Sequence, residues 1–124
     1  MSATGRYHCT VCRIIDGDSL VACIDLGLDV ILTNVHCRLV GIDTPELHHS
    51  DPANRARAQL ARIRLSQLLP DGSDVILESG GSRDKYGRLL ADLYPDGSAL
   101  TAGQILVAEG LARPYSGGPR GEAR

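Results

Sequence analysis

Two short segments of the chain place pairs of carboxylates close together. Asp16 and Asp18 flank a glycine, and Asp43 and Glu46 flank a Thr-Pro pair. Carboxylates and backbone carbonyls are the ligands that a hard cation such as calcium prefers, and Thr44, biased to an extended conformation by the following proline, could turn its carbonyl toward an ion. These residues indicate a metal site, although Asp and Thr also occur in turns for purely structural reasons.

Arg38 and Arg88 add a second kind of chemistry. The planar guanidinium fork of arginine matches the oxygens of a phosphate and stabilises the charge that a phosphodiester gains in its transition state. All but one of the 13 basic residues are arginine, a bias that an arginine-rich genome explains equally well. Together, a metal site, a carboxylate base and a phosphate clamp describe phosphodiester hydrolysis, whereas each residue taken singly fits an ordinary turn or surface position.

Length and composition limit the architecture. A chain of 124 residues without Phe or Trp is expected to form one domain with an aliphatic core, such as a small sheet with helices packed on it. The net charge of −2 gives no bulk signal of a nucleic-acid binder. No apolar run is long enough to span a bilayer and no signal peptide is recognisable, so we expect a cytoplasmic protein without membrane contact, with secretion by a leader that has been removed as the alternative.

Five strands are predicted to position the candidate residues. Apolar patterning marks strands over about 6–15, 20–24, 30–40, 74–79 and 89–94. The first three are separated by short turns and should form an antiparallel meander. Gly17 can adopt backbone angles that other residues avoid, so we expect a sharp bend there that aims Asp16 and Asp18 out of the sheet. Gly80, Gly81 and Ser82 are expected to form a flexible loop.

The third strand imposes a geometric requirement. Side chains alternate along a strand, and Arg38 and Asp43 lie an odd number of positions apart, so an unbroken strand would send them to opposite faces. They can serve one site only if the strand bends or ends near Gly41. The sequence therefore predicts a break at this glycine.

Two helices are predicted between and after the strands. A helix over 51–69 begins at an Asp-Pro pair, and a helix over 101–109 begins with Thr101 and Gln104 at capping-box spacing. The first helix carries one polar and one apolar stripe: Arg55, Gln59, Arg62 and Ser66, and Ala56, Leu60 and Ile63. A solvated face explains the polar stripe, and contact with nucleic acid is the alternative. From Arg113 onward, Gly, Pro and charge indicate a loose tail.

Four cysteines leave three interpretations open. Cys9 and Cys12 have the two-residue gap of a zinc knuckle, but Cys23 and Cys37 do not form a second pair at ligand spacing. In a strand, moreover, residues three apart point to opposite faces. Small buried hydrophobic residues are the default interpretation, a disulfide requires an oxidising compartment, and a zinc protein is the weakest functional hypothesis.

Five motifs follow one another in a defined order. They are Ile15-Asp16-Gly17-Asp18-Ser19, Arg38-Leu39-Val40-Gly41-Ile42-Asp43-Thr44-Pro45-Glu46, Asp84-Lys85-Tyr86-Gly87-Arg88, Asp96-Gly97 and Glu109-Gly110-Leu111-Ala112. In this order the chain resembles the staphylococcal nuclease family, also called thermonuclease-like, from about Tyr7 to Tyr115. An ordered set is far more specific than any single motif.

The resemblance implies both a fold and an activity. The fold is α+β, mainly β: a five-stranded OB-fold barrel with two packed helices over residues 1–115, followed by a flexible C-terminal tail over 116–124. The activity is that of a calcium-dependent nuclease that hydrolyses phosphodiester bonds of single- or double-stranded DNA and RNA and leaves 3′-phosphate ends. A non-catalytic OB-fold module that binds nucleic acid or a protein is the alternative. No sequence feature calls for an obligate protein partner.

The resemblance also implies a role for each matching residue. Arg38, Glu46 and Arg88 would be catalytic, Asp18, Asp43 and the Thr44 carbonyl would bind Ca²⁺, Asp16 would support the metal ligands, and Lys85, Tyr86 and Tyr115 would line the nucleotide pocket. In this scheme Glu46 orients or deprotonates the attacking water, and the two arginines grip the phosphate.

Two departures from the best-known family members stand out. The loop after Glu46 is short and holds His48 and His49, which we expect to be solvent-exposed, where those members have a longer, lysine-rich loop. The chain also stops soon after Tyr115, so we expect the third helix of the longest members to be absent or vestigial.

Overall fold

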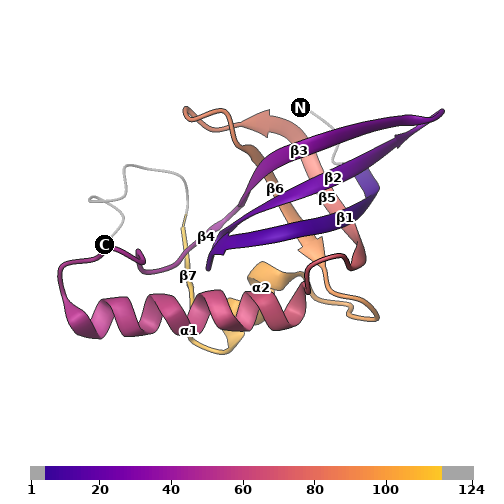
Figure 1. Cartoon of the computed structure of the whole chain (residues 1–124). Helices are drawn as coiled ribbons and strands as arrows, with labels where there is room; N and C mark the ends of the chain where they lie inside the picture. The colour runs from indigo at the N-terminus through magenta and orange to yellow at the C-terminus, as the bar shows by residue number, and fades with distance from the viewer. Residues whose placement is uncertain (1–4, 116–124) are drawn as a thin grey trace.

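In the computed structural model, which describes residues 5–115, a closed five-stranded barrel is packed against two helices (Figure 1). The barrel strands are β1 (Gly5–Asp16), β2 (Ser19–Gly27), β3 (Val30–Leu39), β5 (Asp74–Arg83) and β6 (Leu89–Tyr94), and the helices are α1 (Pro52–Leu68) and α2 (Ala102–Ala108). This confirms the predicted OB-fold barrel with two helices. The predicted tail over 116–124 lies outside the described residues.

The barrel closes through pairings that join distant parts of the sequence. β1, β2 and β3 form the predicted antiparallel meander, and β5 and β6 form a second antiparallel pair. The two groups join where β1 pairs with β5 and where β3 runs parallel to β6 over Cys37–Leu39. Aliphatic side chains from all five strands, together with Leu65, Leu69 and Leu106, fill the interior.

Both helices begin as the sequence predicts. The Asp51 carboxylate caps α1 by accepting a hydrogen bond from the Ala53 N–H. At α2 the Thr101 hydroxyl and the Gln104 side chain form the reciprocal bonds of a capping box. Neither helix of the described residues has the length and apolar character needed to cross a membrane.

The predicted apolar stripe of α1 is not the face that packs on the barrel. The helix buries Ala58, Ala61 and Leu65 instead. The expected stripe faces solvent: Ala56, Leu60 and Ile63. Because Ala58 and Ala61 are small, the helix can approach the turn between β1 and β2 closely, and that approach determines which face is buried.

Arg62 also departs from its predicted place on a solvated stripe. It is half-buried, and its Nε donates a hydrogen bond to the carbonyl oxygen of Ile15 at 3.2 Å. The polar face of α1 therefore helps to hold the end of β1, from which the first acidic motif begins.

Gly17 is needed at the turn for space. The sequence predicts unusual backbone angles there, but Gly17 is not among the glycines with positive φ. A Cβ atom built on Gly17 would lie 2.7 Å from the Cβ of Ala61 and 3.1 Å from the hydroxyl of Thr44. Glycine thus lets α1 and the Thr44 segment lie directly against the turn that carries Asp16 and Asp18.

We expect Gly17→Ala to destabilise the protein by about 1–3 kcal/mol, the usual range for adding a methyl group to a tightly packed contact. Urea unfolding of the native chain and the variant measures this change. Adding Ala61→Gly should recover part of the loss in the double variant, because it removes the opposing methyl group. Simple additivity of the two substitutions would show that this contact does not explain the glycine.

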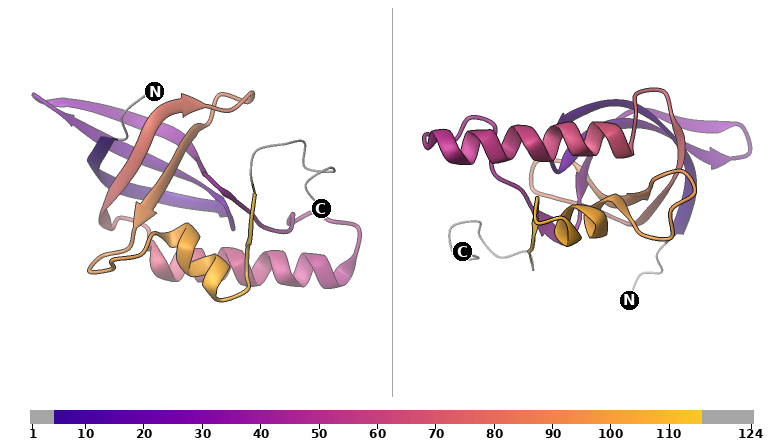
Figure 2. Two further views of the ribbon diagram at one scale, coloured as in Figure 1. Left: turned by 180° about the vertical axis from the view of Figure 1, so that it is seen from behind. Right: turned by 90° about the horizontal axis from the view of Figure 1, so that it is seen from below.

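Arg113, predicted to begin a loose tail, belongs instead to a short sheet. β7 (Arg113–Pro114) pairs antiparallel with β4 (Ile42–Asp43), and the Tyr115 N–H donates to the Gly41 carbonyl oxygen at 2.9 Å. Composition alone suggested a tail, but long-range pairing with β4 orders this segment. Figure 2 shows β7 close to α2, and it belongs to a sheet separate from the barrel.

The predicted glycine-rich loop over 80–82 is also part of a strand. β5 continues to Arg83 and stays paired with β6 through an irregularity between Ser79 and Arg83. The Ser79 hydroxyl accepts a hydrogen bond from the Gly81 N–H, which supports the irregular stretch. A bulge of this kind absorbs extra residues without ending the strand.

Candidate active site

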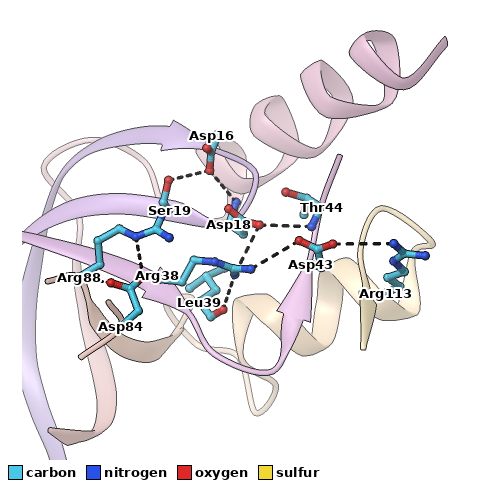
Figure 3. Close-up of polar contacts among 10 residues, drawn as sticks. All are labelled: Asp16, Asp18, Ser19, Arg38, Leu39, Asp43, Thr44, Asp84, Arg88 and Arg113. Atoms are coloured by element: carbon cyan, nitrogen blue, oxygen red, sulfur yellow. Dashed lines mark hydrogen bonds and ion pairs between the residues drawn. The ribbon is translucent and has the colours of Figure 1, made fainter. Parts of the chain in front are cut away.

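Arg38 lies between the two acidic motifs, on β3 opposite Ser19 of β2 (Figure 3). Its side chain is largely buried, and its Nη1 donates to the Leu39 carbonyl oxygen at 2.7 Å. Nη1 also lies 3.4 Å from Asp18 Oδ2, and Nη2 lies 3.6 Å from Asp43 Oδ1. One guanidinium therefore joins the two carboxylates that the sequence analysis assigns to a metal ion.

Asp18 and Asp43 reach Arg38 from different turns. Asp18 lies between β1 and β2, where its carbonyl oxygen accepts from Leu39 N–H at 2.8 Å and its Oδ2 accepts from Thr44 N–H at 3.3 Å. Asp43 lies on β4, after β3 has ended and Gly41 has adopted a φ of 81°. The predicted break at Gly41 is confirmed, and it brings Asp43 to the same side as Arg38.

Asp16 supports the turn that carries Asp18. Its Oδ1 accepts hydrogen bonds from the Ser19 hydroxyl at 2.6 Å and from the Asp18 N–H at 3.2 Å. Burial works to raise the pKa of Asp16, but a hydrogen bond from the Asp18 side chain, followed by those from the Ser19 hydroxyl and the Asp18 N–H and by Arg38, outweighs it and holds the pKa below its ordinary value. Asp16 is therefore ionised and fixes the main chain beside Asp18.

Asp18 has the opposite tendency. Burial raises the pKa of Asp18 to about 6, although Arg38 and the Thr44 N–H favour its ionised form. Only 4% of Asp18 is exposed, so its negative charge depends on nearby positive charge for stability. This carboxylate is suited to bind a cation.

Arg113 belongs to the site although the sequence analysis placed it in a tail. Its Nη2 lies 3.9 Å from Asp43 Oδ2, on the side of Asp43 that faces away from Arg38 (Figure 3). In the sequence, Arg113 directly follows the Glu109-Gly110-Leu111-Ala112 motif. This position was the one local sign that Arg113 could belong to the site. The pairing of β7 with β4, which places it beside Asp43, could not be read from that motif.

Arg88 is held by Asp84 within one turn. Its Nε lies 2.8 Å from Asp84 Oδ2, and its N–H donates to Asp84 Oδ1 at 2.9 Å. Burial works to raise the pKa of Asp84, but the bonds from Arg88 outweigh it and lower the pKa. Asp84, to which the sequence analysis gave no role, therefore orients the guanidinium while leaving its two terminal nitrogens available for a phosphate.

The three predicted nucleotide-binding residues lie in two places. Lys85 Nζ and the Arg88 guanidinium carbon lie 5.3 and 5.6 Å from the centroid of the exposed Tyr86 ring, within cation–π range. Tyr115 is half-buried beside Gly41, and its main-chain N–H donates a hydrogen bond to the Gly41 carbonyl oxygen. Their role in nucleotide binding stays a prediction.

Glu46 is exposed and lines a cavity of about 780 Å³ that begins at Asp43. The other lining residues come from the loop after β4, the first turns of α1 and the segment before β7: Thr44, Pro45, His49, Asn54, Arg57, Gly110, Leu111, Ala112 and Arg113. Its size is that of a small-molecule site. Both carboxylates and arginines line this cavity. The sequence analysis did not select its two arginines, Arg57 and Arg113.

The two loop histidines differ from each other. His48 is exposed as predicted, but His49 is half-buried. The Nδ1 atom of His49 accepts a hydrogen bond from the Asp51 N–H at 3.0 Å, and Arg55 donates to the His49 carbonyl oxygen at 2.9 Å. The prediction of two solvent-exposed histidines is therefore wrong for His49, which helps to begin α1.

The donors around Arg38 suit a hard cation. Asp18 and Asp43 supply carboxylate oxygens, and Thr44 lies next to both with a carbonyl that could add a third. No group of three or more His, Cys, Asp or Glu side chains within residues 5–115 is arranged to hold a metal alone. Calcium takes about six to eight oxygen ligands, so waters would fill the positions that Asp18, Asp43 and the Thr44 carbonyl leave open. No cysteine group among the described residues supports the zinc hypothesis.

Comparisons with known proteins show which family the chain resembles. The family model described as staphylococcal nuclease homologue matches residues 36–123. The chain is 33% identical over 105 residues to both the SPbeta prophage-derived endonuclease YokF and the endonuclease YncB of Bacillus subtilis (strain 168); 84% of this chain aligns with 33% and 46% of theirs. Endonuclease YhcR of the same organism is 29% identical over 120 residues, or 92% of this chain and 9% of its own.

These relatives are longer proteins, of which the chain spans less than half in each case. The family match, in contrast, covers most of this chain and includes Arg38, Asp43, Glu46 and Arg88. The barrel, its two helices and the family match together lead to one assignment: the chain belongs to the staphylococcal nuclease family.

Proposed function

We propose that this chain is a calcium-dependent endonuclease domain that hydrolyses phosphodiester bonds of DNA, RNA or both and leaves 3′-phosphate ends. The observation that carries the proposal is the buried group of Asp18, Asp43 and Arg38, which adjoins a cavity lined by Glu46. The relatives named as endonucleases support the same activity.

Arg38 and a bound cation are alternative countercharges for the two carboxylates. Without an ion, Arg38 offsets part of the negative charge of Asp18 and Asp43. Asp18, Asp43 and the Thr44 carbonyl would hold Ca²⁺, and the guanidinium of Arg38 would then be free to donate to a phosphate. The ion would supply positive charge that polarises the phosphate and a nearby water.

The chain's own residues would then divide the reaction among them. Glu46 accepts the proton of the attacking water as its oxygen adds to phosphorus. Arg38 and Arg88 donate to the phosphate oxygens, which gain charge as the bond to the 5′ oxygen lengthens. When that bond breaks, the 5′ oxygen takes a proton from solvent, and the products are a 3′-phosphate and a 5′-hydroxyl.

The cavity beside Glu46 suggests how a polymer would lie. Arg57 and Arg113 line it, and a polynucleotide has phosphates on both sides of the one being cleaved. Arg88 lies on the opposite side of the Arg38 group from Arg113 (Figure 3). A strand that crosses from one arginine to the other would contact basic side chains at both ends, which supports an endonuclease.

A digestion assay tests the proposal. End-labelled single-stranded DNA and RNA are incubated with the chain in calcium, in other divalent metals and in excess chelator. We expect internal cleavage with calcium only, and products that a polymerase extends only after phosphatase treatment, as 3′-phosphates require. Binding of the strand without cleavage in any metal would favour the non-catalytic module instead.

The pKa of Asp18 predicts how calcium dependence changes with pH. A proton and a cation compete for this carboxylate, whose pKa is raised to about 6. Above this pH Asp18 is ionised and would bind calcium with full affinity. As the pH falls through about 6, protonation of Asp18 should weaken calcium binding. The calcium concentration for half-maximal cleavage should therefore rise between about pH 8 and about pH 5. A constant requirement across this range would contradict the role of Asp18.

Arg88→Lys should lower turnover on the order of 10²-fold, because a point charge cannot replace the two-nitrogen contact of a guanidinium. Asp84 would keep a salt bridge to the lysine, so the thermal midpoint should change little. Arg6→Lys is the control, since Arg6 pairs with Glu78 on a barrel strand outside the candidate site. Equal activity of both variants would remove Arg88 from the catalytic group.

A further inference from the structure

Two cysteines that are distant in the sequence are neighbours on the barrel surface. Cys12 of β1 and Cys23 of β2 have their sulfurs 3.6 Å apart. Cys9, which shares the two-residue spacing with Cys12, is buried in the core together with Cys37. The cysteine pair that the fold creates is therefore not the pair that the sequence spacing suggested.

An irregularity in the β1–β2 ladder produces this proximity. Val11 pairs with Ala22 and Arg13 pairs with Val21, so Cys12 is an additional residue on β1. Cys23 pairs with Thr10, two positions before Cys12 on the same face of the strand. The local twist at such a bulge can bring a diagonal pair into contact.

The four thiols differ in access and in acidity. Cys12 is exposed and Cys23 is half-buried. Burial raises the pKa of Cys9 to about 12 and that of Cys37 to about 11, so both stay protonated and unreactive near neutral pH. Slight desolvation raises the pKa of Cys12, and the contact with Cys23 raises it further. Thiol–disulfide exchange at Cys12 should therefore be faster in alkaline buffer.

We propose that Cys12 and Cys23 form a dithiol modification site that a small-molecule disulfide oxidises to a cross-strand disulfide. One thiolate attacks the small disulfide, whose S–S bond breaks, and a mixed disulfide forms while one small thiol leaves. The second thiolate then attacks the protein sulfur of that mixed disulfide and releases the other small thiol. The protein loses two hydrogen atoms in total, and the oxidant is reduced to two thiols.

The bond would constrain the hairpin that carries the first acidic motif. The sulfurs must approach from 3.6 Å to about 2.05 Å, a movement small enough for side-chain rotation. The closed loop would contain Asp16, Asp18 and Ser19, so the oxidised chain should unfold at higher temperature. This proposal does not depend on nuclease activity.

Oxidised glutathione at about pH 8.5 tests the site on the full chain. We expect the free thiol count to fall from four to two, the mass to fall by two hydrogen atoms, and a peptide map to join Cys12 to Cys23. Dithiothreitol should reverse all three changes.

Cys12→Ser and Cys23→Ser should instead accumulate a glutathione adduct on the remaining surface cysteine, whereas Cys9→Ser should still form the cross-link. A stable glutathione adduct on the native chain, or a cross-link between any other two cysteines, would overturn the proposal.

Discussion

Glu46→Gln should lower the turnover of calcium-dependent cleavage by about 10²–10⁴-fold, the usual contribution of a general base. Glutamine has the shape of glutamate but cannot accept a proton from water at neutral pH. Glu46 is exposed on the loop after β4, so the substitution should leave the unfolding midpoint nearly unchanged. Single-turnover digestion of labelled single-stranded DNA at saturating enzyme measures the chemical step directly.

Glu78→Gln is the matched control for this experiment. Glu78 lies on β5, where it pairs with Arg6 and Tyr94 on the barrel surface. The Glu78→Gln substitution removes the same charge as Glu46→Gln but should keep native turnover. Strand binding by Glu46→Gln should also stay native, which separates a loss of chemistry from a loss of affinity. Cleavage within about twofold of the native rate would exclude Glu46 as the base.

Arg38→Gln should destabilise the calcium-free protein by about 3–5 kcal/mol, the range for removing one partner from a buried ion pair. The substitution leaves Asp18 and Asp43 buried without their shared guanidinium. Cleavage should be lost as well, because Arg38 is a proposed phosphate donor. Urea unfolding without calcium measures the stability, and the same titration with calcium asks whether a cation replaces the missing charge.

Calcium should raise the unfolding midpoint of Arg38→Gln more than that of the native chain, since the variant has a larger unbalanced negative charge. Arg13→Gln is the control, because Arg13 is exposed on β1 and its loss should change stability by no more than about 0.5 kcal/mol. Adding Asp43→Asn to Arg38→Gln should recover part of the stability. Equal stability of the two arginine variants would show that Arg38 is not the countercharge of the acidic pair.

Local chemistry was sufficient to predict the barrel strands and the helix starts. Apolar patterning identified all five barrel strands, and the strand over 89–94 was correct at both ends. Asp51 and the Thr101–Gln104 pair identified both helix starts, because a cap satisfies main-chain groups within a few residues of itself. The break at Gly41 followed from strand geometry alone.

Predictions failed where a contact between distant segments decided the outcome. The buried face of α1 is determined by the close approach of Ala61 to Gly17, and the apolar Leu60 and Ile63 remain outside. Arg113 is ordered by pairing with β4, some 70 residues earlier in the sequence. Neither partner is visible in a local window.

The sequence by itself determined which residues are available for chemistry: the acidic pairs, Arg38, Arg88 and Glu46 all stand in recognisable local motifs. Only the tertiary structure decided how their charges are shared. Arg38 pairs with both Asp18 and Asp43 because the β1–β2 turn, the end of β3 and β4 meet in a region from which water is largely excluded. Charge pairing of this kind depends on distance and burial, and the closed barrel establishes both.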